Sequence, residues 1–142
     1  MRYLFDTSAL LAHYRQEAGW QAVQALFEDI ESEIFIAAPS LTEFARRMHV
    51  LGVEDDEIAA VLATYSLLMA GIVAVDGSVA KAAYDIGRRT PARLPLIDAL
   101  IAAAAQAEGA VLVHRDPHLA AIPAGALAQQ HLAAPDGDAP SH

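Results

Sequence analysis

The sequence contains no cysteine among its 142 residues, so neither a disulfide framework nor a zinc site built on thiolates is possible. It also lacks a G-x-G-x-x-G segment and a Walker-type loop, and no motif therefore predicts nucleotide binding. The first residues do not show the charged-then-apolar pattern of a signal peptide. We therefore expect a cytoplasmic protein.

Charged residues are missing from one long stretch, residues 58–75, which is nearly long enough to cross a bilayer. The stretch also contains Thr64, Tyr65, Ser66 and Gly71, and its last part is rich in β-branched residues. A buried helix that ends at Gly71, followed by a central strand, explains the same residues. We therefore predict no membrane span.

Hydrophobic residues make up 55% of the chain, and short Val/Ile/Leu runs alternate with alanine-rich helical stretches. This alternation predicts one α/β domain over residues 1–132, with a short central parallel sheet of four to five strands flanked by helices. The expected strands are residues 2–5, 34–37, 72–75 and 111–113, and the expected helices are residues 7–14, 19–32, 41–51, 54–70, 78–89 and 96–108. Residues 133–142 are expected to form a disordered C-terminal tail.

Acidic residues stand at four places where an apolar run gives way to a predicted helix, namely Asp6, Glu43, Asp98 and Asp116. Because the carboxyl ends of parallel strands meet at one edge of a sheet, we expect these carboxylates to converge there. Unpaired carboxylates at close range repel one another strongly. Such a cluster therefore implies bound divalent cations.

Each of these acids also has a purely structural explanation. Asp6 and Asp116 stand where N-caps are expected, and Asp98 falls in the first turn of a helix, where the dipole favours a carboxylate. Ser40 and Glu43 have the spacing of a capping box. The functional interpretation therefore rests on all four acids together, and a carboxylate that caps a helix can also bind a metal.

Acidic residues outnumber basic ones by 18 to 9, and the net charge of −9 argues against unspecific binding of nucleic acid. Six of the nine basic residues nevertheless border the acidic motifs, and they are Arg46, Arg47, Arg88, Arg89, Arg93 and Arg115. A basic rim around an acidic centre suits a phosphate-backbone substrate held at metal ions. The alternative is that these arginines lie on solvated helix faces.

The residue types suit Mg²⁺ or Mn²⁺, which prefer oxygen ligands. One or two such ions can lower the pKa of a bound water, orient it for attack and stabilise the leaving oxygen of a phosphodiester. This route needs no histidine or cysteine nucleophile. His114 and His118 have a spacing usable for zinc on a helix, but Pro117 lies between them and other ligands are lacking, so we expect no zinc site.

Taken together, these segments resemble a PIN-domain ribonuclease, in particular a VapC-type toxin of a type II toxin–antitoxin pair. The resemblance covers residues 1–132 and rests on residues 4–10, 41–43, 98–105 and 112–116, in that order. It implies a PIN-like domain with metal-dependent endoribonuclease activity on structured RNA and with Mg²⁺ or Mn²⁺ as cofactor. It also implies a homodimer and a cognate antitoxin that inhibits the activity.

The same resemblance implies roles for individual residues. The catalytic acidic quartet corresponds to Asp6, Glu43, Asp98 and Asp116, of which the three aspartates are the expected metal ligands. Ser8 corresponds to a hydroxyl beside the metal, and we expect it to bind substrate together with Arg46, Arg88, Arg89, Arg93 and Arg115. The chain departs from the family where His114 replaces a common threonine or serine and where Leu119 replaces a common phenylalanine.

Two other functions remain open at this point. A phosphatase of the haloacid-dehalogenase kind also has an aspartate after its first strand, but it needs a second acid two residues later, where this chain has Ser8. It also needs a lysine late in the chain, and Lys81 is the only lysine. The other alternative is a non-catalytic PIN-like module that binds RNA or protein and uses its carboxylates only as helix caps.

Overall fold

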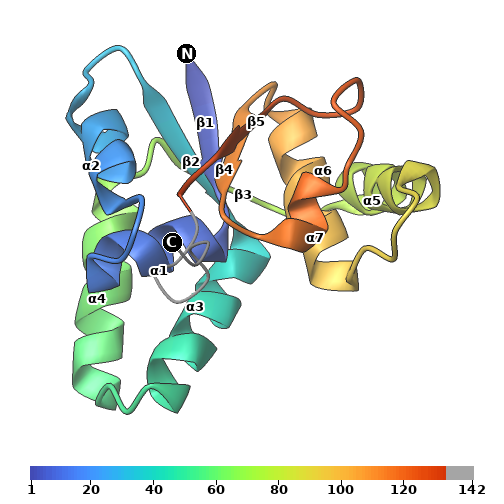
Figure 1. The fold of residues 1–142 in the computed structure, drawn as a ribbon. Helices are drawn as coiled ribbons and strands as arrows, with labels where there is room; N and C mark the ends of the chain where they lie inside the picture. The colour runs from blue at the N-terminus through green and yellow to red at the C-terminus, as the bar shows by residue number, and fades with distance from the viewer. Residues whose placement is uncertain (134–142) are drawn as a thin grey trace, which may run out of the picture.

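A computed structural model of the protein, which describes residues 1–133, contains a five-stranded sheet between two groups of helices (Figure 1). The strands are β1 (Arg2–Phe5), β2 (Glu33–Ala37), β3 (Gly71–Val73), β4 (Val111–His114) and β5 (Gln129–His131). Their order in the sheet is β3-β2-β1-β4-β5, and every neighbouring pair is parallel. The predicted α/β class with a short central parallel sheet is confirmed.

Helices occupy most of the remaining chain: α1 (Thr7–Arg15), α2 (Trp20–Glu28), α3 (Ala38–Val50), α4 (Asp55–Leu68), α5 (Gly77–Arg89), α6 (Leu96–Ala107) and α7 (Pro117–Ala120). Figure 1 shows α1 to α4 on one face of the sheet and α5 to α7 on the other. Successive strand residues point to opposite faces, so Leu4 packs in the core with α5 and α6, whereas Phe5 packs in the core with α1 to α4. Because both faces are covered, the central strands β1, β2 and β4 are mostly apolar, as the sequence indicated, and their charged residues, Arg2 and Glu33, stand at the strand starts.

The helix predicted for residues 19–32 is shorter in the structure, because α2 ends at Glu28. The carboxylate of Asp29 accepts hydrogen bonds from the backbone N–H of Glu31 and from the hydroxyl of Ser32, which form a turn instead of another helical turn. Ile30, which follows the helix, is 98% exposed. It therefore contributes nothing to the core.

The capping box predicted at Ser40 and Glu43 is wrong. Helix α3 begins at Ala38, three residues earlier than expected, because Pro39 fits the first turn of a helix, where its missing N–H has no partner to lose. Ser40 and Glu43 therefore lie inside the helix. The hydroxyl of Ser40 is buried and has no hydrogen-bond partner within residues 1–133.

Strand β5, which lies at one edge of the sheet, is not among the expected strands. Its residues are glutamine and histidine, which do not form an apolar run, and it is held by parallel pairing with β4, for example His131 opposite His114. The third strand also differs slightly, since it covers Gly71–Val73 instead of 72–75. Polar strands at sheet edges are the ones that residue patterns detect least well.

The uncharged stretch 58–75 contains most of α4 and strand β3, so it forms a helix followed by a strand, as predicted. No helix within the described residues is long and apolar enough to span a membrane. The predicted disordered tail, residues 133–142, lies outside the described residues except for Ala133.

Candidate functional site

The edge of the sheet at the carboxyl ends of β1 and β4 positions the first and last acids. Asp6 follows β1 directly, and Asp116 lies two residues after β4. The two strands are parallel neighbours with Phe5 opposite Val113, and the backbone N–H of Asp6 donates to the carbonyl of Val113 at 3.0 Å. The pairing therefore brings two acids that are far apart in the sequence to one place.

The other two acids reach the same place from helices. Glu43 lies in α3, which follows β2, and Asp98 lies in the first turn of α6. All four acids line one cavity of about 150 Å³ together with Thr7, Ser8, Leu11 and Arg47. The structure therefore brings together the four acidic residues that the sequence singled out.

Ser8 holds the most deeply buried of these carboxylates in place. Asp6 is 2% exposed, and its Oδ2 accepts from the Ser8 hydroxyl at 2.6 Å and from the Ser8 backbone N–H at 3.1 Å. The Ser8 hydroxyl oxygen in turn accepts from the backbone N–H of Arg115 at 3.1 Å. One hydroxyl thus links the end of β1 to the end of β4. Asp6 is also the N-cap of α1, so its capping role and its place in the cavity coexist.

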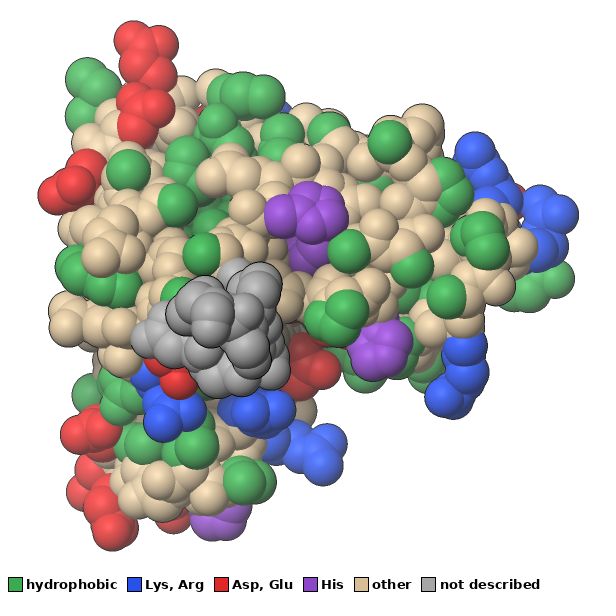
Figure 2. All heavy atoms as spheres, in the orientation of Figure 1, with side chains coloured by type: hydrophobic (Ala, Val, Ile, Leu, Met, Phe, Trp, Pro, Cys, Tyr) green, Lys and Arg blue, Asp and Glu red, His purple; other side chains and the backbone are tan. Residues whose placement is uncertain are grey.

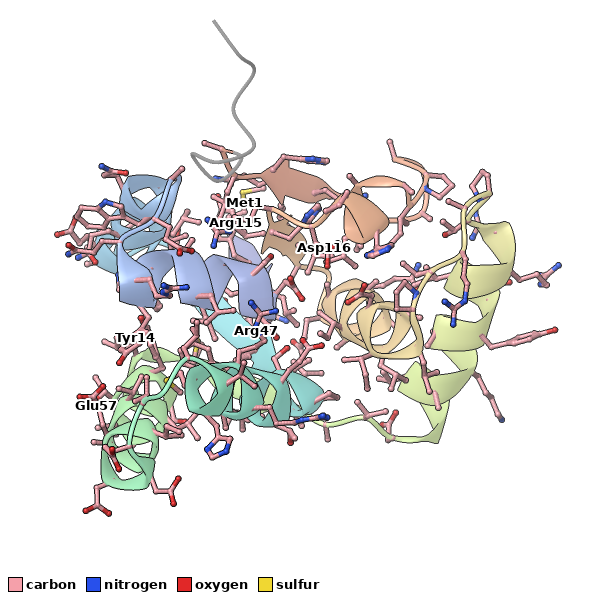
Figure 3. All side chains as sticks on the ribbon, turned by 60° about the horizontal axis from the view of Figure 1, so that its bottom comes forward. Met1, Tyr14, Arg47, Glu57, Arg115 and Asp116 are labelled. Carbon is pink, nitrogen blue, oxygen red and sulfur yellow. The ribbon has the colours of Figure 1, made fainter. Side chains whose placement is uncertain are left out.

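Three residues of the cavity were missing from the predicted site: Thr7, Leu11 and Arg47. The Thr7 hydroxyl donates to Glu43 Oε1 at 2.6 Å and thereby orients that carboxylate. Arg47 lies four residues after Glu43 on α3, so both side chains share one face of the helix and line the same cavity. Figure 3 shows Arg47 and Asp116 facing the space between α1 and α6.

Burial and like charge disfavour ionisation of two of the acids. Burial, opposed by the hydrogen bonds from Ser8, raises the pKa of Asp6 from 3.8 to about 6, with a smaller contribution from the neighbouring Glu43 and Asp116. Burial followed by the charges of Asp116, Asp6 and Glu43 raises the pKa of Asp98 from 3.8 to about 7. Such crowding is what a bound cation would relieve. The site therefore fits a divalent metal ion.

His118 approaches the same carboxylates. Its Nδ1 lies 3.3 Å from Asp116 Oδ1 and 3.9 Å from Asp98 Oδ2. Within residues 1–133, Asp98, Asp116 and His118 form the one group whose possible ligand atoms all lie within 4.8 Å of one another. Asp6 and Glu43 share the cavity with Asp98 and Asp116 but do not belong to this tighter group.

His114, unlike His118, is buried and has both ring nitrogens hydrogen-bonded within the protein. Its ring is fully buried, Nδ1 accepts from the backbone N–H of Asp116 at 3.1 Å, and Nε2 lies 2.7 Å from Gln129 Oε1. Because Nδ1 is an acceptor, Nε2 bears the proton and donates to Gln129. Burial lowers the pKa of His114, which favours this neutral form. Both nitrogens are therefore engaged, and His114 cannot form a zinc pair with His118.

The predicted substrate-binding arginines lie in several places. The Arg115 guanidinium is 10% exposed and pairs with Glu17, so its side chain is turned away from the cavity, and Figure 3 shows it above α1 with Arg47 below. Arg88 and Arg89 pair with Asp85 on α5. Arg88 and Arg93 also line a larger groove between α5 and α6. Arg46 lines a hollow between α3 and α4.

Figure 2 shows where the basic and acidic side chains lie on the surface. Basic side chains cover part of α3 and, separately, the α5 end of the molecule, while acidic side chains gather at the first turn of α4. Arg47 is the arginine that the structure puts in the acidic cavity. The predicted basic rim is therefore divided into separate groups.

The chain matches a known protein family, and its fold is similar to that of several solved structures. A family model of the PIN domain matches residues 3–125. The fold is similar to that of VapBC2 from Rickettsia felis bound to a promoter DNA fragment, with a TM-score of 0.73, 17% identity and coverage of 92% of this chain and 98% of that one. No curated protein matches the sequence.

Two further structures have a similar fold. FitAcB from Neisseria gonorrhoeae has a TM-score of 0.70 at 20% identity, covering 91% of this chain and 96% of that one. VapBC-5 from Mycobacterium tuberculosis, a member of the VapBC family of toxin–antitoxin systems, has a TM-score of 0.63 at 20% identity, covering 92% of this chain and 98% of that one. At these identities the similarity concerns the fold alone.

Proposed function

The chain belongs to the PIN domain family, and from that premise we propose that it is a metal-dependent endoribonuclease that cleaves structured RNA as the toxin of a toxin–antitoxin pair. The observation that carries the proposal is the convergence of Asp6, Glu43, Asp98 and Asp116 on one cavity at the carboxyl edge of the sheet. The pKa values of Asp6 and Asp98 are raised, as expected for buried carboxylates that lie close to other acids at a site where a cation can bind.

The three aspartates are the proposed ligands of Mg²⁺ or Mn²⁺, and Glu43 lies beside them. A divalent ion bound there would polarise a water molecule and neutralise the charge of a phosphodiester. The protein contributes the geometry. Ser8 fixes the Asp6 carboxylate by two hydrogen bonds, and Thr7 fixes that of Glu43 by one. Holding these groups in advance avoids the cost of ordering them when substrate binds.

Arg47 is the proposed contact for a substrate phosphate next to the acids. Its side chain lines the cavity, and within residues 1–133 it forms no salt bridge, so its five N–H donors remain available for an anion. Arg46, Arg88, Arg89 and Arg93 are then proposed to contact more distant phosphates. Arg115 is left out of this role because its guanidinium is committed to Glu17.

A cognate antitoxin and a second copy of the chain are the proposed partners in the cytoplasm. The similar VapBC and FitAcB structures support the first, because VapBC-5 is described as a member of a toxin–antitoxin family. An antitoxin segment with an arginine would fit the acidic cavity, since a guanidinium can bridge two carboxylates. Exposed apolar residues near the end of α4, Leu67 at 87% and Leu68 at 52%, favour a further buried surface and hence a homodimer.

The two alternatives of the sequence analysis differ from this proposal in testable ways. The family membership removes the haloacid-dehalogenase phosphatase, and Ser8 indeed hydrogen-bonds Asp6 where that chemistry needs an acid. A non-catalytic binding module would retain RNA or protein without cleaving it. The raised pKa of Asp98 favours the nuclease, because a carboxylate used only as a cap is stabilised in its charged form.

The test is cleavage of end-labelled structured RNAs by the purified full chain in Mg²⁺, Mn²⁺ or EDTA. We expect cleavage in either metal and none in EDTA, with Asp98→Asn at least roughly 100-fold slower, since even outer groups of metal sites matter by 10- to 100-fold. The matched control is Asp56→Asn, the same substitution in the first turn of α4, outside the cavity. Retention of RNA without cleavage by the wild type would favour the binding module.

A further inference from the structure

We infer that His118 is a nitrogen ligand of the metal site and that it makes the site select a first-row transition ion such as Mn²⁺ over Mg²⁺. This inference rests on the proposed metal-dependent function and deepens it, because it names a ligand and a preference that the acidic residues alone do not supply. It depends on the arrangement of Asp98, Asp116 and His118 at the carboxyl end of β4.

The separations between the three side chains match a shared ion. Ligand atoms that lie about 2.1 Å from one ion are about 3.0 Å apart when adjacent and about 4.2 Å apart when opposite in an octahedral shell. His118 Nδ1 lies 3.3 Å from Asp116 Oδ1 and 3.9 Å from Asp98 Oδ2. These distances lie between the two ideal values, and the candidate ligand atoms of all three side chains lie within 4.8 Å of one another, so small side-chain shifts would let one ion contact all three.

Asp98 gives an independent reason to expect a ligand at this point. The residue is 8% exposed, and no donor of residues 1–133 lies within hydrogen-bond distance of its carboxylate. A largely buried carboxylate that no protein donor contacts is poorly stabilised in its charged form, and a cation is a partner that stabilises it. Asp116 differs, because its Oδ1 accepts from the backbone N–H of His118 at 2.8 Å as the N-cap of α7.

That same cap fixes the position of His118. Asp116, Pro117 and His118 are consecutive, and the cap hydrogen bond holds the backbone of His118 against the carboxylate while Pro117 sets the first turn of α7. The His118 side chain is 58% exposed, against 11% for Asp98 and 23% for Asp116. It can therefore accept an ion from solvent while Asp98 and Asp116 contact it from the protein side.

The chemistry of the ligand set determines the preference. Mg²⁺ is held almost entirely by oxygen atoms and waters, whereas imidazole nitrogen is a common ligand of transition ions, whose affinity for nitrogen exceeds that of Mg²⁺. A site made only of Asp6, Glu43, Asp98 and Asp116 has no reason to prefer Mn²⁺ strongly. Addition of one imidazole supplies that reason.

The experiment measures Mn²⁺ binding to the full-length, RNA-free protein by the electron paramagnetic resonance signal of free Mn²⁺, followed by displacement with Mg²⁺. We expect His118→Gln to weaken Mn²⁺ binding by at least roughly tenfold and to change Mg²⁺ binding much less, so that less Mg²⁺ displaces the Mn²⁺. His118→Ala should behave alike. The matched control is His49→Gln, an exposed histidine on α3 outside the acidic cavity, which should bind as the wild type does.

The outcomes separate the ligand assignment from the nuclease proposal. A His118-dependent preference in a protein that cleaves no RNA would support the ligand and refute the nuclease. An unchanged ratio of Mn²⁺ to Mg²⁺ affinity in His118→Gln, with binding still lost in Asp98→Asn, would overturn the ligand and leave the nuclease standing. Failure of the wild type to bind Mn²⁺ would overturn the ligand assignment, and failure to bind either Mn²⁺ or Mg²⁺ would overturn both proposals.

Discussion

Replacement of a buried charged residue usually lowers the stability of a protein, but replacement of Asp98 by asparagine should raise it. In metal-free buffer above pH 7, the wild type must keep a carboxylate ionised at a position where burial and three neighbouring acids oppose its charge. Asparagine has nearly the same shape and no charge. We therefore expect Asp98→Asn to be more stable than the wild type in EDTA.

The magnitude follows from the pKa of Asp98. A pKa raised from 3.8 to about 7 corresponds to about 4 kcal/mol of unfavourable free energy once the group is fully ionised. The cavity opens to solvent and the acids titrate as a coupled group, so about 2 kcal/mol of this is expected for one substitution. Loss of a negative charge in the first turn of α6 offsets about 0.5 kcal/mol. The net expectation is a gain of about 1.5 kcal/mol.

The pH dependence has a definite sign. The folded protein binds the Asp98 proton more tightly than the unfolded chain, so the free energy of unfolding of the wild type falls as pH rises from about 4 to about 7 and then levels off. Asp98→Asn lacks this contribution. The advantage of the variant should therefore be small at pH 4, grow through this interval, and remain constant above it.

Urea unfolding followed by circular dichroism at pH 5 and pH 8, in EDTA and in saturating Mn²⁺, measures these differences. Mn²⁺ should stabilise the wild type and not Asp98→Asn, so the order of stability should reverse when the metal is added. Asp56→Asn, which removes an acid from the first turn of α4, should be slightly less stable than the wild type at both pH values. If Asp98→Asn unfolds at clearly lower urea than the wild type in EDTA at pH 8, the reasoning is refuted.

Four further predictions concern cleavage, RNA binding, the support of the site and assembly. Cleavage should leave a 5′-phosphate and a 3′-hydroxyl and should fail with Ca²⁺, as mass spectrometry of the products can establish; 2′,3′-cyclic phosphate formed in EDTA would contradict it. Arg47→Gln should lower the salt slope of RNA binding by about 1, and Arg46→Gln by less; equal slopes would contradict the special place of Arg47. His114→Val should cost about 1–3 kcal/mol in urea unfolding, whereas His114→Thr should cost less because a hydroxyl can still accept from the Asp116 N–H; the opposite order would contradict this role. Light scattering should show a dimer that Leu67→Glu converts to monomer, and a monomeric wild type at micromolar concentration would exclude the dimer.

The acidic quartet is the part of the site that the sequence determined. Asp6 and Asp116 follow short apolar runs that indicate buried strands, and parallel strands align their carboxyl ends whatever their order in the sheet. Asp98 stands among apolar residues near the start of a helix, a pattern that agrees with its 8% exposure. These conclusions need only the hydrophobic pattern of short segments and the general rule that crossovers between parallel strands are right-handed.

The tertiary structure decided which neighbours surround those acids. Two adjacent arginines on α3 differ by about 100° around the helix, so Arg47 lines the cavity and Arg46 does not. Arg115 follows β4 directly, yet it pairs with Glu17 from a loop about a hundred positions earlier in the chain. Such choices depend on contacts between distant segments, and the residues themselves show no pattern that would reveal them.

The two histidines near β4 illustrate the same limit. Their spacing alone allowed a zinc pair, but His114 is enclosed by β5, a polar strand that no apolar run predicts, and Gln129 of that strand engages its second nitrogen. His118 lies outside the enclosure, beside Asp98 and Asp116. The sequence determined the apolar strands and the acids that follow them, because burial and alternation are local properties. Only the folded chain decided which histidine can reach a metal, because that depends on how β5 and α6 pack around the end of β4.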